Sequence, residues 1–301
     1  MATPLELAAM RRAIALSAFG LGTTSPNPPV GCVILDRDGQ LVGQGYHRRK
    51  GEAHAEALAV ADAGERARGG TAVVTLEPCN HHGRTPPCHQ TLIDAGIRRV
   101  LVALIDPTSR GEGGVALLRQ AGLEVEVGVV ADEARLVLGP WLQALKTKRP
   151  HVHWLPVLDG IADTDVLMVV PDAAALKARH DVVLTADGKV IEAVVGVHGD
   201  NLTLPKQINL AEPKAALAEL YRGGVRSVLL VSGHEQVQPF IEAALIDLVT
   251  AYVREEGRQS GDGPANIGTV LPDEVRLVDV IKLAGWVRLS ARADENRSGT
   301  R

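Results

Sequence analysis

Two stretches decide how this 301-residue chain is interpreted: GEAHAEALAV at residues 51–60 and LEPCNHHGRTPPC at residues 76–88. Together they hold His54, Glu56, Cys79 and Cys88, although the whole chain has only three cysteines. A hydrophobic core does not need an imidazole, a carboxylate and two thiols at this spacing, whereas a metal centre does. The two stretches therefore indicate a metal site.

The residue types are those of a catalytic zinc site. A catalytic zinc keeps three protein ligands and leaves its fourth position for water, and His54, Cys79 and Cys88 supply one imidazole and two thiolates. Zinc lowers the pKa of a bound water to roughly 7, so hydroxide becomes available at neutral pH. Glu56 falls in the first turn of the helix expected after His54, and it is the candidate general acid and base.

The local sequence predicts where each thiol lies. TAVVTLEP at residues 71–78 is typical of a buried strand that Pro78 ends, so Cys79 falls at a strand-to-helix junction. CHQTLIDAG at residues 88–96 predicts a helix that begins with Cys88. The N-terminus of a helix stabilises a thiolate through its dipole and its free N–H groups, which favours the charged form that a metal requires.

Zinc nucleobase deaminases share a signature of His-x-Glu followed by Pro-Cys-x-x-Cys. Here the residues NHHGRTPP separate the two cysteines, and they predict a polar loop beside the metal. A structural zinc is one alternative, and it would need a fourth protein ligand from among His81, His82 and His89. A chance arrangement is the other, because a lone His-x-Glu is usually a solvated helix face and a lone cysteine a buried hydrophobe.

The composition excludes several classes of protein. Apolar residues make up 46% of the chain and aromatic residues 3%, which suits a sheet of Ala, Val, Leu and Ile buried between helices. The net charge of −4 argues against a nucleic-acid surface. We expect no signal peptide, no membrane span and no disulfide framework, and therefore a cytoplasmic location.

The order of elements predicts two α/β domains. In the first half, strands alternate with short helices, which indicates a three-layer α/β/α sandwich that includes a hairpin turning at Asp38 and Gly39. KTKRPHVHW at residues 146–154 is basic, contains Pro150 and is the expected linker. The predicted domains are therefore residues 1–147 and 148–301.

Several motifs resemble one known family. SPNPPVGCVI, HAE, TLEPCNHHGRTPPC and LIDAGIRRVLVALIDP resemble the deaminase domain of the bifunctional riboflavin-biosynthesis deaminase/reductases, over about residues 5–147. The resemblance implies a cytidine-deaminase-like fold and zinc-dependent replacement of a ring amino group by water. The implied substrate is a diaminohydroxypyrimidine that carries a phosphoribosylamino group. His54, Cys79 and Cys88 would be the Zn²⁺ ligands and Glu56 the proton shuttle.

The resemblance also assigns five residues to the substrate: Asn27, His47, His81, Arg84 and Asp106. Asn27 would hydrogen-bond the pyrimidine, Asp106 would reach the ribose, and the others would surround the base and the phosphoribosyl group. Arg84 stands where the family often has Lys, and Thr108 where it usually has Asn. The resemblance therefore supports recognition of the sugar phosphate less strongly than it supports deamination, and turn or surface roles remain open for these residues.

The second half departs from the family pattern. There the family has an NADPH-dependent, dihydrofolate-reductase-like domain whose opening strand carries Lys and Ser before LDG, whereas this chain reads HWLPV. A later turn reads VSGHE in place of Glu-Gly-Gly, which puts His234 where backbone N–H groups should approach a cofactor phosphate. We therefore expect a shortened, degenerate reductase-like domain with doubtful NADPH binding.

Three functional alternatives remain beside this deaminase hypothesis. The chain could retain NADPH-dependent reductase activity, or deaminate a related pyrimidine in a specialised pathway. It could also be a non-catalytic scaffold that keeps zinc for folding. The expected partners are a small pyrimidine ribotide and a second copy of the chain in a homodimer, with no nucleic acid and no membrane.

Overall fold

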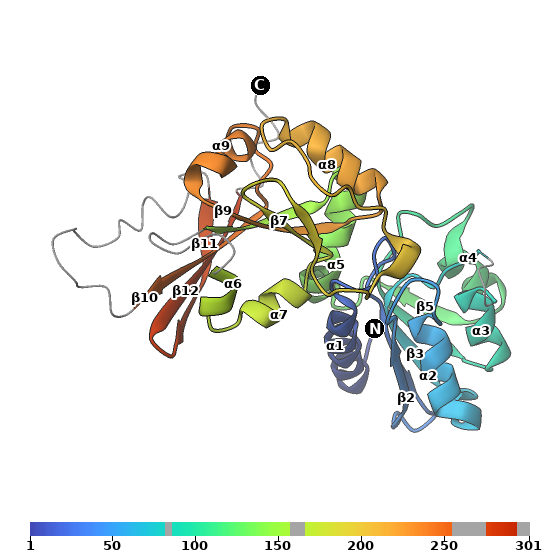
Figure 1. The fold of residues 1–301 in the computed structure, drawn as a ribbon. Coiled ribbons are helices and arrows are strands. Elements are labelled where there is room, and N and C mark those ends of the chain that lie inside the picture. Colours follow the sequence, from blue (N-terminus) through green and yellow to red (C-terminus); the bar gives the residue numbers. More distant parts are fainter. Residues whose placement is uncertain (82–85, 157–165, 255–274, 294–301) are drawn as a thin grey trace, which may run out of the picture. The chain divides into compact units, whose positions relative to one another are not determined.

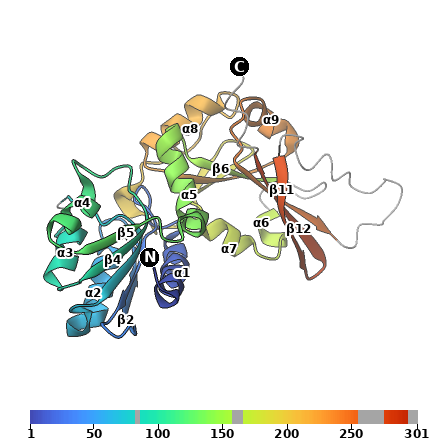
Figure 2. The ribbon, with the colours of Figure 1, turned by 180° about the vertical axis from the view of Figure 1, so that it is seen from behind.

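The computed structural model describes residues 1–81, 86–156, 166–254 and 275–293. The chain forms two compact units, Met1–Leu142 and Gln143–Arg301 (Figure 1 and Figure 2). Within the described ranges no helix has the length and apolar character needed to span a bilayer. The segment expected as a linker is largely regular structure, because it contains the end of helix α5 (Ala131–Thr147) and the start of strand β6 (His151–Pro156).

The first unit is built on a five-stranded sheet with the order β2-β1-β3-β4-β5. Its strands are β1 (Gly31–Leu35), β2 (Leu41–Tyr46), β3 (Thr71–Leu76), β4 (Arg99–Leu104) and β5 (Glu124–Val127). Strand β1 runs antiparallel to β2 and β3, whereas β3, β4 and β5 are parallel. The predicted hairpin is present, and the Asp36 carboxylate closes its turn by accepting from the N–H groups of Asp38 and Gln40.

Helices cover both faces of this sheet, as the sequence predicted (Figure 1). They are α1 (Pro4–Ser17), α2 (Ala55–Ala63), α3 (Cys88–Asp94) and α4 (Gly113–Gln120), with short 3₁₀ turns at Ala18–Gly20 and Gly64–Ala67. Helix α5 follows them and continues past Leu142, where the first unit ends. Helix α1 packs on β1 and β3, and α2 packs on β1 and β2. An added Cβ at Gly45 of β2 would lie 2.6 Å from the Ala55 carbonyl oxygen, so glycine lets α2 approach closely and fixes where this helix begins.

The second unit contains a seven-stranded sheet with the order β11-β12-β10-β6-β9-β7-β8. Its other strands are β7 (Val182–Thr185), β8 (Val190–Glu192), β9 (Ser227–Ser232), β10 (Leu248–Arg254), β11 (Val275–Leu283) and β12 (Trp286–Ala293). Its helices are α6 (Val166–Val169), α7 (Ala173–Ala178), α8 (Pro213–Arg222) and α9 (His234–Glu242), with a 3₁₀ turn at Gly199–Asn201. Strands β10, β6, β9 and β7 are parallel, and antiparallel strands flank them.

Each face of this sheet has its own apolar core. Val152 and Trp154 of β6 belong to the core that includes Phe240 of α9, whereas Leu155 belongs to the core that includes Leu176 of α7. This alternation is the ordinary consequence of side chains pointing to opposite faces of a strand. The mixed α/β architecture predicted for both halves of the chain is therefore confirmed.

Candidate active site

His54, Cys79 and Cys88 come together in the first unit. The His54 Nδ1 atom lies 3.2 Å from the Cys88 Sγ atom and 3.6 Å from the Cys79 Sγ atom. The three donor atoms lie within 4.8 Å of one another. One imidazole and two thiols in this arrangement fit a tetrahedral zinc with one open position.

Local structure sets the position of each donor. His54 is the extended N-cap residue of α2, with φ −73° and ψ 164°. Cys79 follows the end of β3, and Cys88 is the first residue of α3, as the sequence predicted. The Cys88 N–H donates a hydrogen bond to the Cys79 sulfur at 3.3 Å, so the start of α3 directly supports the other thiol.

The hydrogen bonds around Cys79 favour its thiolate. A bond from the Cys88 thiol lowers the pKa of Cys79 most, and bonds from His54 and from the Cys88 backbone act in the same direction. Burial of the side chain opposes this shift. The thiolate is the form of cysteine that binds a metal, so the lowered pKa favours metal binding by Cys79.

Glu56 is buried beside these donors, with 3% of its surface exposed. It lies in the first turn of α2, and burial raises the pKa of its carboxyl to about 7. A carboxyl group with a pKa near neutrality can both accept and donate a proton at that pH. Glu56 therefore has the position and the environment expected of a proton shuttle.

The histidines proposed as a fourth ligand of a structural zinc do not join the donor group within the described part of the chain. The His81 side chain is exposed, and His89 Nδ1 lies 3.1 Å from the Cys79 carbonyl oxygen, which occupies it. His82 lies outside the described residues. Among the described residues the centre therefore has three ligands, which is the number found in a catalytic rather than a structural zinc site.

Asn27 and His47 form a hydrogen-bonded pair next to His54. His47 Nδ1 lies 3.2 Å from the Ala53 carbonyl oxygen, and its Nε2 atom lies 3.2 Å from Asn27 Nδ2. A carbonyl can only accept, so Nδ1 carries the proton, and a neutral ring then accepts at Nε2 from the Asn27 amide. Burial lowers the pKa of His47, in agreement with the neutral form. Both ring nitrogens of His47 are thus occupied by groups of the protein.

The other predicted substrate residues are less constrained. Asp106 closes its own turn, because its Oδ1 atom accepts from the Thr108 N–H and the Thr108 hydroxyl, both at 2.7 Å. Its second carboxylate oxygen accepts no hydrogen bond from Thr108. Arg84 lies outside the described residues.

Sequence reasoning missed Glu77, which is 5% exposed and lies between β3 and Cys79. Its carboxylate accepts from Val115 N–H at 2.9 Å, from the Ser109 hydroxyl at 2.9 Å and from Asp106 N–H at 3.3 Å. The available signal was an acidic residue directly after a buried apolar strand, because a carboxylate at such a place needs several donors.

The second unit buries polar groups of another kind. His153 of β6 lies between His180 and Thr250, with contacts of 3.1 Å to His180 Nε2 and 2.8 Å to the Thr250 hydroxyl. His180 Nδ1 lies 2.8 Å from the Leu176 carbonyl oxygen. None of these residues was a sequence candidate.

The turn between β9 and α9 also departs from a simple phosphate site. The Trp154 indole N–H donates to the Ser232 carbonyl at 3.1 Å, and the Trp154 and His234 rings lie 6.1 Å apart.

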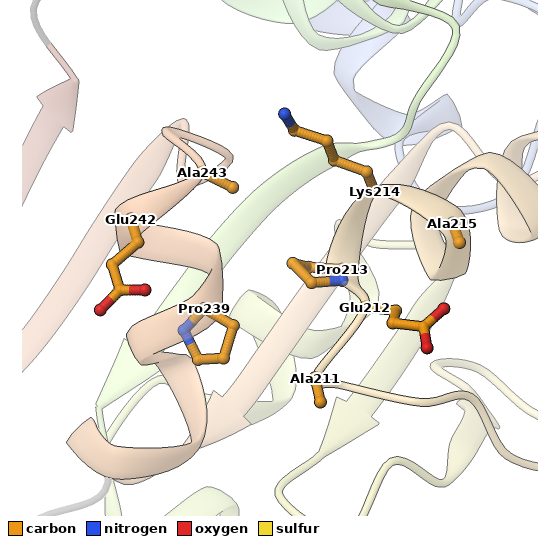
Figure 3. A pocket seen from close by; sticks show the side chains of 8 residues that line it. All are labelled: Ala211, Glu212, Pro213, Lys214, Ala215, Pro239, Glu242 and Ala243. Atoms are coloured by element: carbon orange, nitrogen blue, oxygen red, sulfur yellow. The ribbon is translucent and has the colours of Figure 1, made fainter.

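A hollow lies between α8 and α9. Pro213 and Pro239 line it, and the charged ends of Lys214 and Glu242 do not converge (Figure 3). This hollow therefore offers no cluster of polar groups comparable with the His54 centre.

Several comparisons with known proteins match mainly the first half of the chain. The sequence model for the "Cytidine and deoxycytidylate deaminase zinc-binding region" matches residues 5–104. RibD of Escherichia coli is 49% identical over 145 residues, which cover 48% of this chain and 39% of that protein. The chain thus matches about two fifths of the length of the first such relatives.

Two other relatives match over most of their length. The diaminohydroxyphosphoribosylamino-pyrimidine deaminase of Buchnera aphidicola is 45% identical over 142 residues, or 47% of this chain and 96% of that protein. RibD of Corynebacterium ammoniagenes is 34% identical in an alignment 288 positions long, which covers 83% of this chain and 86% of that protein.

Two solved structures match nearly the whole chain. RibD of Acinetobacter baumannii has a TM-score of 0.75 at 28% identity and covers 97% of this chain and 99% of its own. A diaminohydroxyphosphoribosylaminopyrimidine deaminase/5-amino-6-(5-phosphoribosylamino)uracil reductase from Thermotoga maritima has a TM-score of 0.77 at 25% identity, covering 96% and 99%.

Proposed function

The chain belongs to the RibD family of riboflavin-biosynthesis proteins and carries its zinc-dependent deaminase domain, and from that premise we propose that the first unit deaminates the diaminohydroxypyrimidine ring of a phosphoribosylamino intermediate. The observation that carries this proposal is the convergence of His54, Cys79 and Cys88 beside the buried carboxyl of Glu56. The imidazole and the two sulfurs would hold the zinc.

Zinc in such a site supplies an activated water at neutral pH. Glu56 accepts a proton from the attacking water and delivers it to the amino nitrogen that departs, so a ring C–N bond is replaced by a C–O bond and ammonia leaves. The position of Glu56 in the first turn of α2, two residues after His54, keeps its carboxyl next to the metal donors.

Asn27 would orient the ring. His47 engages the Asn27 amide nitrogen, so the amide oxygen would be the atom that accepts from an N–H group of the pyrimidine. His47 then acts through Asn27 rather than by touching the substrate. We assign His81, Arg84 and Asp106 to the phosphoribosyl group on the family resemblance.

The test is ammonia release from the diaminohydroxypyrimidine ribotide by zinc-loaded protein. Glu56→Gln should lower the rate by about a thousandfold or more while zinc content and melting stay unchanged. Glu65→Gln, an exposed residue just beyond the same helix, is the matched control and should keep full activity. Folded, zinc-loaded wild type without any release would contradict the proposal and favour the scaffold alternative.

Thr108 motivates a test of the substrate itself. Its hydroxyl is engaged by Asp106, at the position where the family usually has Asn. We expect the ribotide to react faster than the nucleoside or the free base. A preference for the free base would favour a deaminase recruited to another pyrimidine.

For the second unit we propose a reductase-like domain without reductase activity. The exposed His234 at the start of α9 and the Trp154 contact to Ser232 support this proposal. A bifunctional enzyme is the second candidate, because the match to the Thermotoga maritima deaminase/reductase spans 99% of that chain. NADPH oxidation in the presence of the deaminated product would overturn our proposal, and unchanged absorbance would support it.

A further inference from the structure

Glu77 occupies a junction between the metal site and a neighbouring segment. It follows the last residue of β3 and precedes Cys79 by two positions. Its backbone N–H donates to the Leu104 carbonyl at 2.8 Å, which holds the ends of β3 and β4 together. The side chain is buried, so its carboxylate must be compensated inside the protein.

Among the described residues, the hydrogen bonds to this carboxylate come from one segment, residues 106–115, which follows β4 and ends in the first turn of α4. Oε1 accepts from Val115 N–H, and Oε2 accepts from Ser109 hydroxyl and Asp106 N–H. Bonds to an ionised acceptor are roughly twice as strong as neutral ones. Glu77 thus ties both ends of the segment to the turn that carries Cys79.

Two further contacts reinforce the same junction. The Asn80 side chain bonds the Arg110 backbone at both ends, donating to its carbonyl oxygen and accepting from its N–H at 3.3 Å. A Cβ added at Gly114 would overlap the Pro78 carbonyl oxygen, so the start of α4 lies directly against the metal-binding turn.

We propose that Glu77 is a positioning residue that holds residues 106–115 as one wall of the substrate site and keeps that wall in register with the zinc ligands. The inference rests on the proposed deaminase function, because it assumes that Asp106 faces the substrate. Glu77 itself touches neither the substrate nor the donor atoms, and it acts through the backbone of Asp106 and through Ser109.

A carboxylate is required because every partner of Glu77 is a donor. In Glu77→Gln the shape is retained, but either orientation of the amide places its NH₂ group against a backbone N–H, that of Val115 or that of Asp106. The substitution therefore loosens the segment while the core volume stays the same. The expected result is a KM raised by about tenfold, equivalent to about 1.4 kcal/mol, with kcat and the visible spectrum of the Co²⁺-substituted protein little changed.

A double-mutant cycle separates positioning from folding. If Glu77 acts through Asp106, Glu77→Gln should raise KM much less in an Asp106→Ala background than in wild type. Ser109→Ala, which removes one donor and leaves the backbone bonds, should raise KM by about twofold and serves if Glu77→Gln does not fold. Glu112→Gln is the matched control, because Glu112 lies in the same segment but is exposed and bonds only Gln120 among the described contacts.

The outcomes are distinguishable. An active wild type with an unchanged KM in folded Glu77→Gln, or additive effects in the cycle, would overturn the positioning role alone. A lower melting temperature with unchanged KM would identify Glu77 as merely structural and overturn it too. An inactive, zinc-loaded wild type would overturn the proposed function and this inference together.

Discussion

His54 in the first unit and His153 in the second are both histidines brought into contact with other chemically active side chains, but their ring nitrogens are used differently. His54 Nδ1 faces two sulfur atoms, so all three atoms are of the kinds that zinc takes as ligands. His153 instead bonds His180 on one side and Thr250 on the other. The first arrangement calls for a cation, whereas the second is complete without one.

In the second arrangement, the last acceptor determines which atom donates in each hydrogen bond. The Leu176 carbonyl can only accept, so His180 Nδ1 carries a proton and His180 Nε2 accepts from His153 Nδ1. His153 Nε2 then accepts from the Thr250 hydroxyl. Burial lowers the pKa of both rings, which keeps them neutral. The comparison teaches that a histidine marks a metal site where its neighbours are themselves metal ligands, and not simply where its ring is buried.

The largest expected effect would come from removing a converging donor. Cys79→Ala should lower zinc affinity by more than about a hundredfold, since losing a residue that only supports a ligand already costs about 10- to 100-fold. Deamination should be lost with the metal. Elemental analysis of purified protein measures this directly, and Cys32→Ala is the control, because Cys32 is a fully buried core residue of β1. Full zinc content in Cys79→Ala would remove the distinction between the two histidine sites.

A smaller effect is expected from breaking the series of hydrogen bonds that joins Thr250, His153 and His180. Thr250→Val keeps the shape of the side chain but leaves His153 Nε2 without its donor, which should destabilise the second unit by about 1–3 kcal/mol. Hydrogen exchange should quicken in peptides covering β6 and β10. Zinc content and the rate of deamination per folded molecule should not change. A loss of zinc in Thr250→Val would show that the hydrogen bonds of Thr250, His153 and His180 contribute to the metal site.

The two regions also differ in how well the sequence predicts them. His54, Glu56, Cys79 and Cys88 fall in two short stretches whose strand and helix boundaries are marked by Pro78 and by apolar patterning, so local sequence was sufficient. The three zinc-site donors are brought together as expected. The role of each substrate residue remains a prediction.

Residues whose role depends on distant partners could not be predicted in this way. Glu77 is paired with residues 29 to 38 positions away, and His153 with residues 27 and 97 positions away. No local pattern records such pairings, because they exist only once the strands are placed side by side. The overall α/β class was predictable because hydrophobic periodicity is itself local.

The smallest effect is the dependence of stability on pH that arises from the buried histidines of the second unit. The folded-state pKa of His153 is lowered, and that of His180 is lowered to about 4, mainly by burial. The unfolded chain therefore binds more protons than the folded chain between about pH 6.5 and pH 4. As the pH decreases through this range, the free energy of unfolding should fall by at most about 1.4 kcal/mol per pH unit for each histidine. The neighbours that modulate this include His151, Arg179 and Asp181.

His198 gives the internal control for this measurement, because its contribution to stability changes with pH in the opposite direction. Burial lowers its pKa, but the Asp181 and Glu192 carboxylates outweigh burial and raise it overall. Its contribution to stability is therefore present at low pH and lost as the pH rises through the raised value. Urea unfolding followed by tryptophan fluorescence should show a shallower acid slope in His180→Gln and a shallower alkaline slope in His198→Gln. If His180→Gln leaves the acid slope unchanged, the chain of His180, His153 and Thr250 is not the neutral, closed arrangement that separates it from the metal site.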